Sequence, residues 1–404
     1  MTAGFVSRAN LQVVVPLGIT QTIGYGTIYY AYTVLAEPIS QETGLTLSAV
    51  FGCFSLGLLA GAAVATFAGR LLDRHHPARV MAAGSVVAAL LMALWALVPG
   101  KTAFALFAVL TQAASVLVFY EAAFVTAARL IPHNARRTIT GITLIAGFAS
   151  TIFWPLTAAL VREMSWREVY LIYAALNLLV CVPLHLLLSR QPARGQQATG
   201  QPQVDGAAAT PSTARTGRDR RIVYVLLQIS FAANAYVIAA VHLHLVGILG
   251  ALGLGLAAAS IGALIGPSQV AGRIVEFVGG SRVSITAVSL IAAGLLPVAL
   301  MILLLGTPAI SAGIAFAVLF GIGQGLSYIV RGVLPLAVFG LAGYGALTGQ
   351  FNLVRLLVAA SAPFLTAVIL DRGGTTLALT SIAVAATASV AALIGVVPYV
   401  RRMR

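Results

Sequence analysis

Residues 68–73 read Ala-Gly-Arg-Leu-Leu-Asp, and residues 271–276 read Ala-Gly-Arg-Ile-Val-Glu. Each stretch closes the second long apolar run of its half of the chain. A further pair occurs later in each half, because residues 140–155 and residues 348–363 both begin with Thr-Gly and end with Pro. Matches at equivalent places in the two halves predict an internally duplicated chain.

The apolar runs around these repeats predict a membrane protein. Of the 404 residues, 60% are hydrophobic and 8% are charged, whereas about a quarter of a soluble domain is charged. Runs of about 20 apolar residues are long enough to cross the hydrocarbon core as helices. We therefore predict an all-α, polytopic fold of twelve transmembrane helices, over residues 11–36, 45–68, 80–98, 103–130, 138–161, 167–188, 222–249, 255–277, 283–306, 309–338, 347–370 and 375–400.

The composition changes once along the chain. Residues 189–221 are rich in Gln, Ala, Gly, Pro, Thr and Arg and hold almost no bulky apolar side chain, so they predict a flexible linker. Two pseudo-symmetric six-helix bundles are expected on either side, over residues 1–188 and 222–404.

The distribution of basic residues predicts the orientation. The net charge is +14, yet basic residues gather in alternate loops rather than in one nucleic-acid-binding patch. With both termini in the cytoplasm, the outer loops hold only Lys101, Arg162, Arg167 and Arg372. This asymmetry follows the positive-inside rule and predicts a multi-pass protein of the inner (plasma) membrane with both termini cytoplasmic.

The loop at residues 69–79 resembles the signature of the major facilitator superfamily, in which a Gly-x-x-x-Asp-Arg turn precedes another basic residue. The sequence differs from that pattern at residues 75–77, where His-His-Pro replaces a glycine-containing turn. The resemblance implies secondary transport by alternating access of two bundles. It also implies a conformational latch, in which the Asp73 carboxylate accepts hydrogen bonds from an arginine or from a helix N-terminus. The residues of this predicted latch are Gly69, Asp73, Arg74 and Arg79.

Two patches are similar to monocarboxylate and oxalate/formate-like porters of that superfamily. They are residues 334–345, after the tenth predicted helix, and residues 136–147, at the start of the fifth. At residues 266–268 the chain reads Gly-Pro-Ser, where these porters carry an arginine before a proline. The two patches therefore favour a carboxylate substrate, whereas residues 266–268 do not support one.

Glu121 is the only carboxylate well inside an apolar segment, about 12 Å from the inner end of its helix. Ionisable groups at such depth are costly, and a carboxylate that switches between charged and neutral forms suits proton coupling or gating. The alternative is an ion pair that fixes helix packing. His242 is a second candidate for proton transfer, with neutral helix packing as its alternative.

The predicted solute contacts are polar residues on helix faces. Arg331 shares a face with Gln324 and Tyr328, and its guanidinium can bind a carboxylate in a two-pronged geometry. Snorkelling to the lipid headgroups is the alternative for this arginine. The resemblance implies that the first, fourth, seventh and tenth helices line a central cavity. The predicted contacts are therefore Arg331, Gln21, Tyr25, Tyr120, Asn234, Gln324 and Tyr328.

These observations predict a monomeric carrier that moves a small organic solute with protons, and a small organic anion is the first hypothesis. An exporter of hydrophobic or cationic compounds, with Glu121 binding the cation, is the alternative. A non-transporting sensor and a membrane-embedded enzyme are less well supported, because no signalling domain and no converging catalytic groups are evident. The sequence has no phosphate-binding loop of the P-loop type and no metal-ligand cluster, so neither ATP, a cofactor nor a metal is expected.

Overall fold

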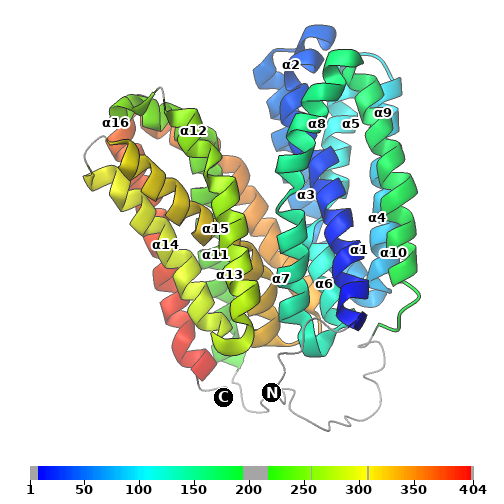
Figure 1. The fold of residues 1–404 in the computed structure, drawn as a ribbon. Helices are drawn as coiled ribbons and strands as arrows, with labels where there is room; N and C mark the ends of the chain where they lie inside the picture. The colour runs from blue at the N-terminus through cyan, green and yellow to red at the C-terminus, as the bar shows by residue number, and fades with distance from the viewer. Residues whose placement is uncertain (1–7, 194–216, 256, 307–308, 402–404) are drawn as a thin grey trace. The chain divides into compact units, whose positions relative to one another are not determined.

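The computed structural model describes residues 8–193, 217–255, 257–306 and 309–401. Its secondary structure within these residues is helical throughout, as predicted. The chain divides into two compact units, one of Met1–Gln203 with Leu341–Leu353 and the other of Val204–Gly340 with Val354–Arg404. Figure 1 shows the helices within each unit running alongside one another. The predicted bundle boundaries stay a prediction, and residues 194–216 of the predicted linker lie outside the described residues.

The first unit contains helices that correspond to the first six predicted segments. Several segments are divided into shorter pieces. The pieces are α1 (Arg8–Gly24), η1 (Tyr25–Tyr30), α2 (Ala31–Thr43), α3 (Leu47–Arg74), α4 (Pro77–Leu97), α5 (Lys101–Ala114), η2 (Ser115–Leu117), α6 (Tyr120–Leu130), η3 (Pro132–Asn134), α7 (Ala135–Ala146), α8 (Ala149–Glu163), α9 (Trp166–Leu176), η4 (Asn177–Cys181) and α10 (Val182–Leu188).

The second unit begins with α11, which starts inside the predicted linker. Asp219 lies in the first turn of that helix, where a negative charge is favourable. The elements are α11 (Gly217–Leu249), η5 (Gly250–Leu254), α12 (Ala258–Ala263), α13 (Ile265–Gly279), η6 (Gly280–Arg282), α14 (Ile285–Leu305), α15 (Ile310–Phe339) and α16 (Tyr344–Arg401), whose first turns pack with the first unit.

Nine helical stretches among the described residues are long and apolar enough to cross a membrane. One of them, Tyr344–Val400, contains Gly374 at φ 70° and ψ −174°, a non-helical conformation that suits glycine. This stretch therefore corresponds to two predicted segments. Predicted segments 11–36 and 255–277 are helical but consist of shorter pieces, so each of the twelve predicted segments has a helical counterpart.

The cores of the two units differ in composition. In the first unit, Trp95 is enclosed by other aromatic rings, with centroids 4.4 Å from Tyr170, 5.4 Å from Phe104 and 5.7 Å from Tyr32. The core of the second unit is mostly aliphatic and contains the stacked pair Phe316 and Phe320. Because lipid tails are themselves apolar, these contacts stabilise the units through close packing rather than by exclusion of water.

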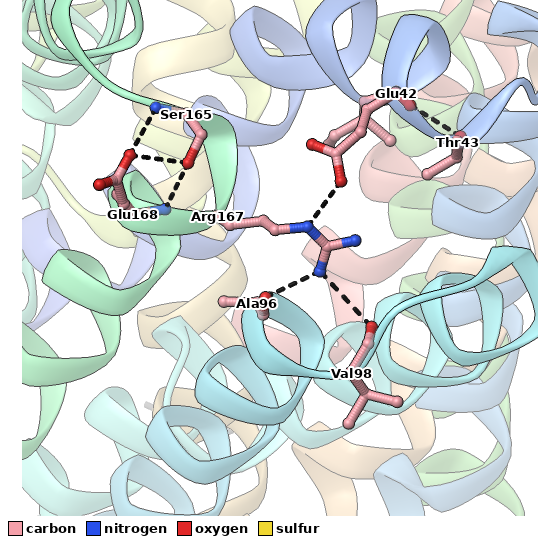
Figure 2. Close-up of polar contacts among 8 residues, drawn as sticks. Glu42, Thr43, Ala96, Val98, Ser165, Arg167 and Glu168 are labelled. Atoms are coloured by element: carbon pink, nitrogen blue, oxygen red, sulfur yellow. Dashed lines mark hydrogen bonds and ion pairs between the residues drawn. The ribbon is translucent and has the colours of Figure 1, made fainter.

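One end of the first unit is held by charged side chains (Figure 2). Ser165 and Glu168 form a reciprocal capping box at the start of α9. Nε of the neighbouring Arg167 donates to Oε1 of Glu42 at 2.6 Å, and a terminal nitrogen of its guanidinium donates to the Ala96 carbonyl at 2.7 Å. Its guanidinium carbon also lies 4.5 Å from the centroid of the Trp166 ring. Arg167 thus joins the ends of α2 and α4 to the start of α9.

We expect Arg167→Ala to lower the stability of the first unit more than Glu42→Ala. The arginine change removes the carbonyl bond and the ring contact, which should cost about 1–2 kcal/mol. The glutamate change removes only a partly exposed ion pair, which is worth about 0–1 kcal/mol. Thermal unfolding in detergent, followed by tryptophan fluorescence, measures both, because the chain's three tryptophans lie in the first unit: Trp95, Trp154 and Trp166. Equal losses would contradict the assigned role of the carbonyl bond.

Candidate functional site

The fourth predicted segment is broken in its middle. Helix α5 ends at Ala114, the 3-10 turn η2 follows, and Phe119 is extended at φ −79° and ψ −173° before α6 begins at Tyr120. Glu121 therefore lies in the first turn of a half-helix, where the helix dipole favours a negative charge, and its side chain is 8% exposed. Discontinuous helices of this kind form binding sites in many transporters.

Four aromatic rings surround this break, and we call them the Tyr25 stack: Tyr25, Phe119, Tyr120 and Phe124. The ring of Tyr25 lies on that of Phe119, with centroids 4.1 Å apart and planes 11° apart. Tyr25 is also 4.7 Å from Tyr120, which stacks on Phe124 at 5.2 Å. The structure thus brings the predicted contacts Tyr25 and Tyr120 together beside Glu121.

Two glutamines contact the same region through their amide nitrogens. Nε2 of Gln21 donates to the Val118 carbonyl at 2.6 Å, and Nε2 of Gln112 donates to the Ile28 carbonyl at 2.8 Å. Gln21 is 0% exposed and Gln112 is 1% exposed. Gln21, which was predicted to contact solute, therefore uses its amide group to bond the backbone just before α6.

In the second unit, α15 carries the predicted residues Gln324, Tyr328 and Arg331. The guanidinium carbon of Arg331 lies 5.0 Å from the centroid of the Tyr328 ring, and that of Arg273 lies 5.2 Å from it. Arg273 is buried and donates to the Gly325 carbonyl at 3.3 Å. One tyrosine ring therefore contacts two positive charges, an arrangement stabilised by cation–π attraction.

Helix α11 supplies the other predicted residues of this unit. Nδ2 of Asn234 donates to Oγ of Ser327 at 3.3 Å, and His242 lies close to the side chain of Gln324. His244 points elsewhere, with Nε2 3.0 Å from the Pro363 carbonyl. His242 and Asn234 therefore face α15, whereas His244 faces the helix that contains Pro363.

Three predicted latch residues, Gly69, Asp73 and Arg74, lie at the end of α3, and the fourth, Arg79, lies in the first turn of α4. Oδ1 of Asp73 accepts from the Gly345 amide at 2.8 Å, and Oδ2 accepts from the Ala346 amide at 2.7 Å. Gly69 makes this approach possible, because a Cβ there would lie 2.1 Å from the Gly345 carbonyl oxygen. The carboxylate of Asp73 thus caps the N-terminus of α16, one of the two arrangements considered from sequence. Arg74 and Arg79 are exposed.

Arg129 holds the other side of the same loop. A terminal nitrogen of its guanidinium donates to three backbone carbonyls, those of Leu72 at 2.7 Å, His75 at 2.9 Å and Asp73 at 3.1 Å. These carbonyls end α3 and have no in-helix donor of their own. Arg129 therefore fixes the backbone from which the Asp73 carboxylate extends.

Sequence reasoning assigned no role in the site to three of these residues: Gln112, Arg129 and Arg273. Arg273 had a signal, because it occupies the place of Arg70 in the repeated motif. Gln112 also had one, as an amide in the middle of an apolar segment. Among the described residues, no group of three or more His, Cys, Asp and Glu side chains could hold a metal ion.

Helices long and apolar enough to cross a membrane, a half-helix that carries a buried carboxyl group, and an arginine inside an apolar segment are typical of secondary carriers. The chain belongs to the Major Facilitator Superfamily, whose family model matches residues 17–363. It is a multi-pass membrane transporter of that family and not an enzyme. No curated protein sequence matches the chain.

Solved structures of the same family have a similar fold. The human organic anion transporter MFSD10 (TETRAN) gives a TM-score of 0.67 at 14% identity, over 95% of this chain and 99% of that one. FucP in its outward conformation gives 0.70 at 14% identity, over 96% and 99%. The proton:xylose symporter XylE, bound to 6-bromo-6-deoxy-D-glucose, gives 0.70 at 11% identity, over 98% and 97%. These likenesses confirm the predicted fold and carry no information on the substrate.

We expect Asp73→Asn to loosen the start of α16. Asparagine keeps one acceptor oxygen and turns an NH₂ group toward the second backbone amide, so one hydrogen bond is lost and the other is no longer charge-assisted. Exchange of the Gly345 and Ala346 amides should rise about tenfold, measured by hydrogen–deuterium exchange of peptides covering residues 341–353. Asp371→Asn, at an exposed aspartate, is the matched control. Unchanged exchange in Asp73→Asn would show that the carboxylate does not hold this helix end.

Proposed function

We propose that the protein is a proton-coupled carrier of a small organic anion in the inner (plasma) membrane, working by alternating access with both termini in the cytoplasm. The family supports secondary transport as the general activity. The choice of an anion rests on the residues of the second unit, and the choice of protons rests on Glu121. The Asp73 loop, with Gly69, Arg74 and Arg79, would act as the conformational latch.

The observation that carries the anion proposal is the pair of guanidinium groups at Tyr328. Arg331 lies well inside α15, eight residues before its end at Phe339, or about 12 Å along the helix. A positive charge at this depth is costly and marks functional sites in membrane proteins. A guanidinium binds a carboxylate through two parallel hydrogen bonds. Gln324 supplies a further polar group on the same face of α15, and His242 supplies one from α11.

Glu121 is the proposed coupling group. Its carboxyl is enclosed, and it stands at the N-terminus of a half-helix that stabilises the ionised form. Loss or gain of one proton there changes the charge of the first unit without any change of solute. His242 is the second candidate for proton transfer.

The Tyr25 stack supports the alternative, an exporter of lipophilic cations. Aromatic faces beside a carboxylate are the chemistry that attracts an organic cation. MFSD10 is described as an organic anion transporter, but its likeness to this chain is one of fold alone. The choice between an anion carrier and a cation exporter must therefore come from variants of this protein. The two patches similar to monocarboxylate porters favour the anion and stay a prediction.

Flux into proteoliposomes with an imposed inward proton gradient separates these proposals. Radiolabelled benzoate is the anion probe and tetraphenylphosphonium is the cation probe. We expect gradient-driven benzoate uptake by the wild type. In Arg331→Gln the uptake rate should fall at least about tenfold, because the two-pronged contact with the carboxylate is removed. In Glu121→Gln the dependence of uptake on the proton gradient should fall by a similar factor. Arg372→Gln, at an exposed arginine, is the matched control.

Uptake or extrusion of tetraphenylphosphonium that requires Glu121 and is indifferent to Arg331→Gln would overturn the anion proposal in favour of the cation exporter. Benzoate uptake by Glu121→Gln that keeps its full response to the gradient would remove Glu121 from the coupling role.

The proposed orientation is tested by thiol labelling in a variant lacking Cys53 and Cys181. Thr102→Cys lies in a predicted outer loop and His133→Cys in a predicted inner loop, and both positions are exposed. A membrane-impermeant maleimide added to intact cells should label the first and reach the second only after permeabilisation. The reverse pattern would place the termini outside.

A further inference from the structure

The two glutamine bonds of the first unit are reciprocal. Gln21, on α1, donates to the backbone of the segment that leads into α6, whereas Gln112, on α5, donates to the backbone of η1. Each helix therefore supplies one amide to the irregular part of the other. Tyr25 is the first residue of η1, and Glu121 lies in the first turn of α6, directly after the break.

The Val118 carbonyl needs a donor from outside its own helix. Helix α6 begins its hydrogen bonding with the Ala123 amide, which donates to the Phe119 carbonyl at 3.1 Å. On the other side of the break, the Phe119 amide donates back to the Ser115 carbonyl at 2.9 Å. The Val118 carbonyl lies between these two runs of backbone hydrogen bonds and accepts a hydrogen bond from Nε2 of Gln21.

The Ile28 carbonyl lies in a π-helical turn. The Ala31 amide donates to the Gly26 carbonyl, five residues back instead of four. Hydrogen bonds in such a turn depart from the regular i−4 pattern, so the local backbone is less uniformly held than in an α-helix. Nε2 of Gln112 donates to the Ile28 carbonyl inside this turn and so ties it to α5.

The chemistry of the contacts fixes which end of each amide faces the backbone. A carbonyl only accepts, so the atom facing it is the nitrogen, and Oε1 is the remaining atom. Within the described residues, Oε1 of Gln21 and Oε1 of Gln112 are both enclosed without a hydrogen-bond partner. Leucine would fill similar space without burying an unbonded oxygen, so the NH₂ donor is what these positions require.

The surrounding packing makes room for Gln112. A Cβ on Gly57 of α3 would lie 2.4 Å from the Cβ of Gln112, so glycine is needed for this approach. The glutamine is thus held at a close helix contact rather than at a loosely packed surface.

We propose that Gln21 and Gln112 are positioning residues of the transport site, which hold Tyr25 and Glu121 in place through the backbone. Val118 is three residues before Glu121, and Ile28 is three residues after Tyr25, so each bond fixes the turn that carries one of these side chains. Gln21 then acts on the backbone instead of contacting solute. The inference rests on the proposed function of Tyr25 and Glu121 in transport.

Hydrogen–deuterium exchange tests the two bonds directly. In Gln21→Leu, exchange of the Phe119 and Ala123 amides should rise at least about tenfold, because the Val118 carbonyl loses its donor and the break frays. In Gln112→Leu, the Ala31 amide should respond in the same way. Gln228→Leu is the matched control, because Gln228 is a partly buried glutamine of α11 whose side-chain nitrogen and oxygen find no hydrogen-bond partner among the residues that the structure describes.

A conservative variant of Gln112 separates the effect of the hydrogen-bond donor from the effect of side-chain shape. Gln112→Glu keeps the length of the side chain, and the hydroxyl of its protonated form can donate to the Ile28 carbonyl. Exchange at Ala31 should therefore return toward the wild-type rate when that carboxyl is protonated. Wild-type exchange in both leucine variants, or the same rise along the whole chain and in Gln228→Leu, would overturn the proposal.

Benzoate flux under a proton gradient then links the bonds to transport. Gln21→Leu should lose at least about tenfold of the gradient-driven rate, as Glu121→Gln does, whereas Gln228→Leu should keep the wild-type rate. Normal flux together with raised local exchange would overturn the positioning role. If the wild type moves neither benzoate nor tetraphenylphosphonium, the proposed function fails, and the exchange measurement alone decides whether the two amides hold the broken helices.

Discussion

A backbone N–H or C=O group in hydrocarbon has no water to bond, so each must find a partner inside the protein. Regular helices meet this constraint by themselves, and irregular ones need side chains. In the first unit, Gln21 bonds the carbonyl of Val118 and Gln112 bonds that of Ile28. At a third irregularity, η4, Nδ2 of Asn177 donates to the Tyr173 carbonyl and to Oγ1 of Thr27. The amide side chains in these helices therefore have a structural role. Of the residues that the proposed mechanism uses, Tyr25 lies in one of the irregular turns and Glu121 directly follows another.

The same constraint acts at helix ends, where charge decides which side chain can serve. A helix N-terminus offers amide hydrogens and carries partial positive charge, so the carboxylate of Asp73 suits the start of α16. A helix C-terminus offers carbonyl oxygens, so guanidinium groups suit it. Arg129 serves the end of α3 in this way, and Arg167 contacts the carbonyl of Ala96 near the end of α4. Aspartate and arginine at these places are thus explained by hydrogen bonding alone, before any role in transport is considered.

The helices and the loop at residues 69–79 could be predicted from the sequence, because the length of an apolar run and the spacing of Gly, Asp and Arg are local properties. The sequence was not sufficient for the break at residues 115–119, which contains neither glycine nor proline. That break depends on a donor from Gln21, almost a hundred residues away in sequence. The pairing of Arg331 with Tyr328 followed from helical spacing, whereas the second guanidinium at that ring, from Arg273, depends on how α13 packs against α15.

The two units share a sequence motif, at residues 68–73 and 271–276, but their charged groups differ. In the first unit, the repeated motif places Asp73 against the amides of α16, and the buried charge of the broken helix is a carboxylate. In the second unit, the same motif places Arg273 against Tyr328, where Arg331 adds a second positive charge. In the carrier that we propose, a titrating carboxyl and a permanently positive guanidinium have separate tasks, one binding the proton and the other the anion. The two units therefore offer different charged groups in spite of the sequence motif that they share.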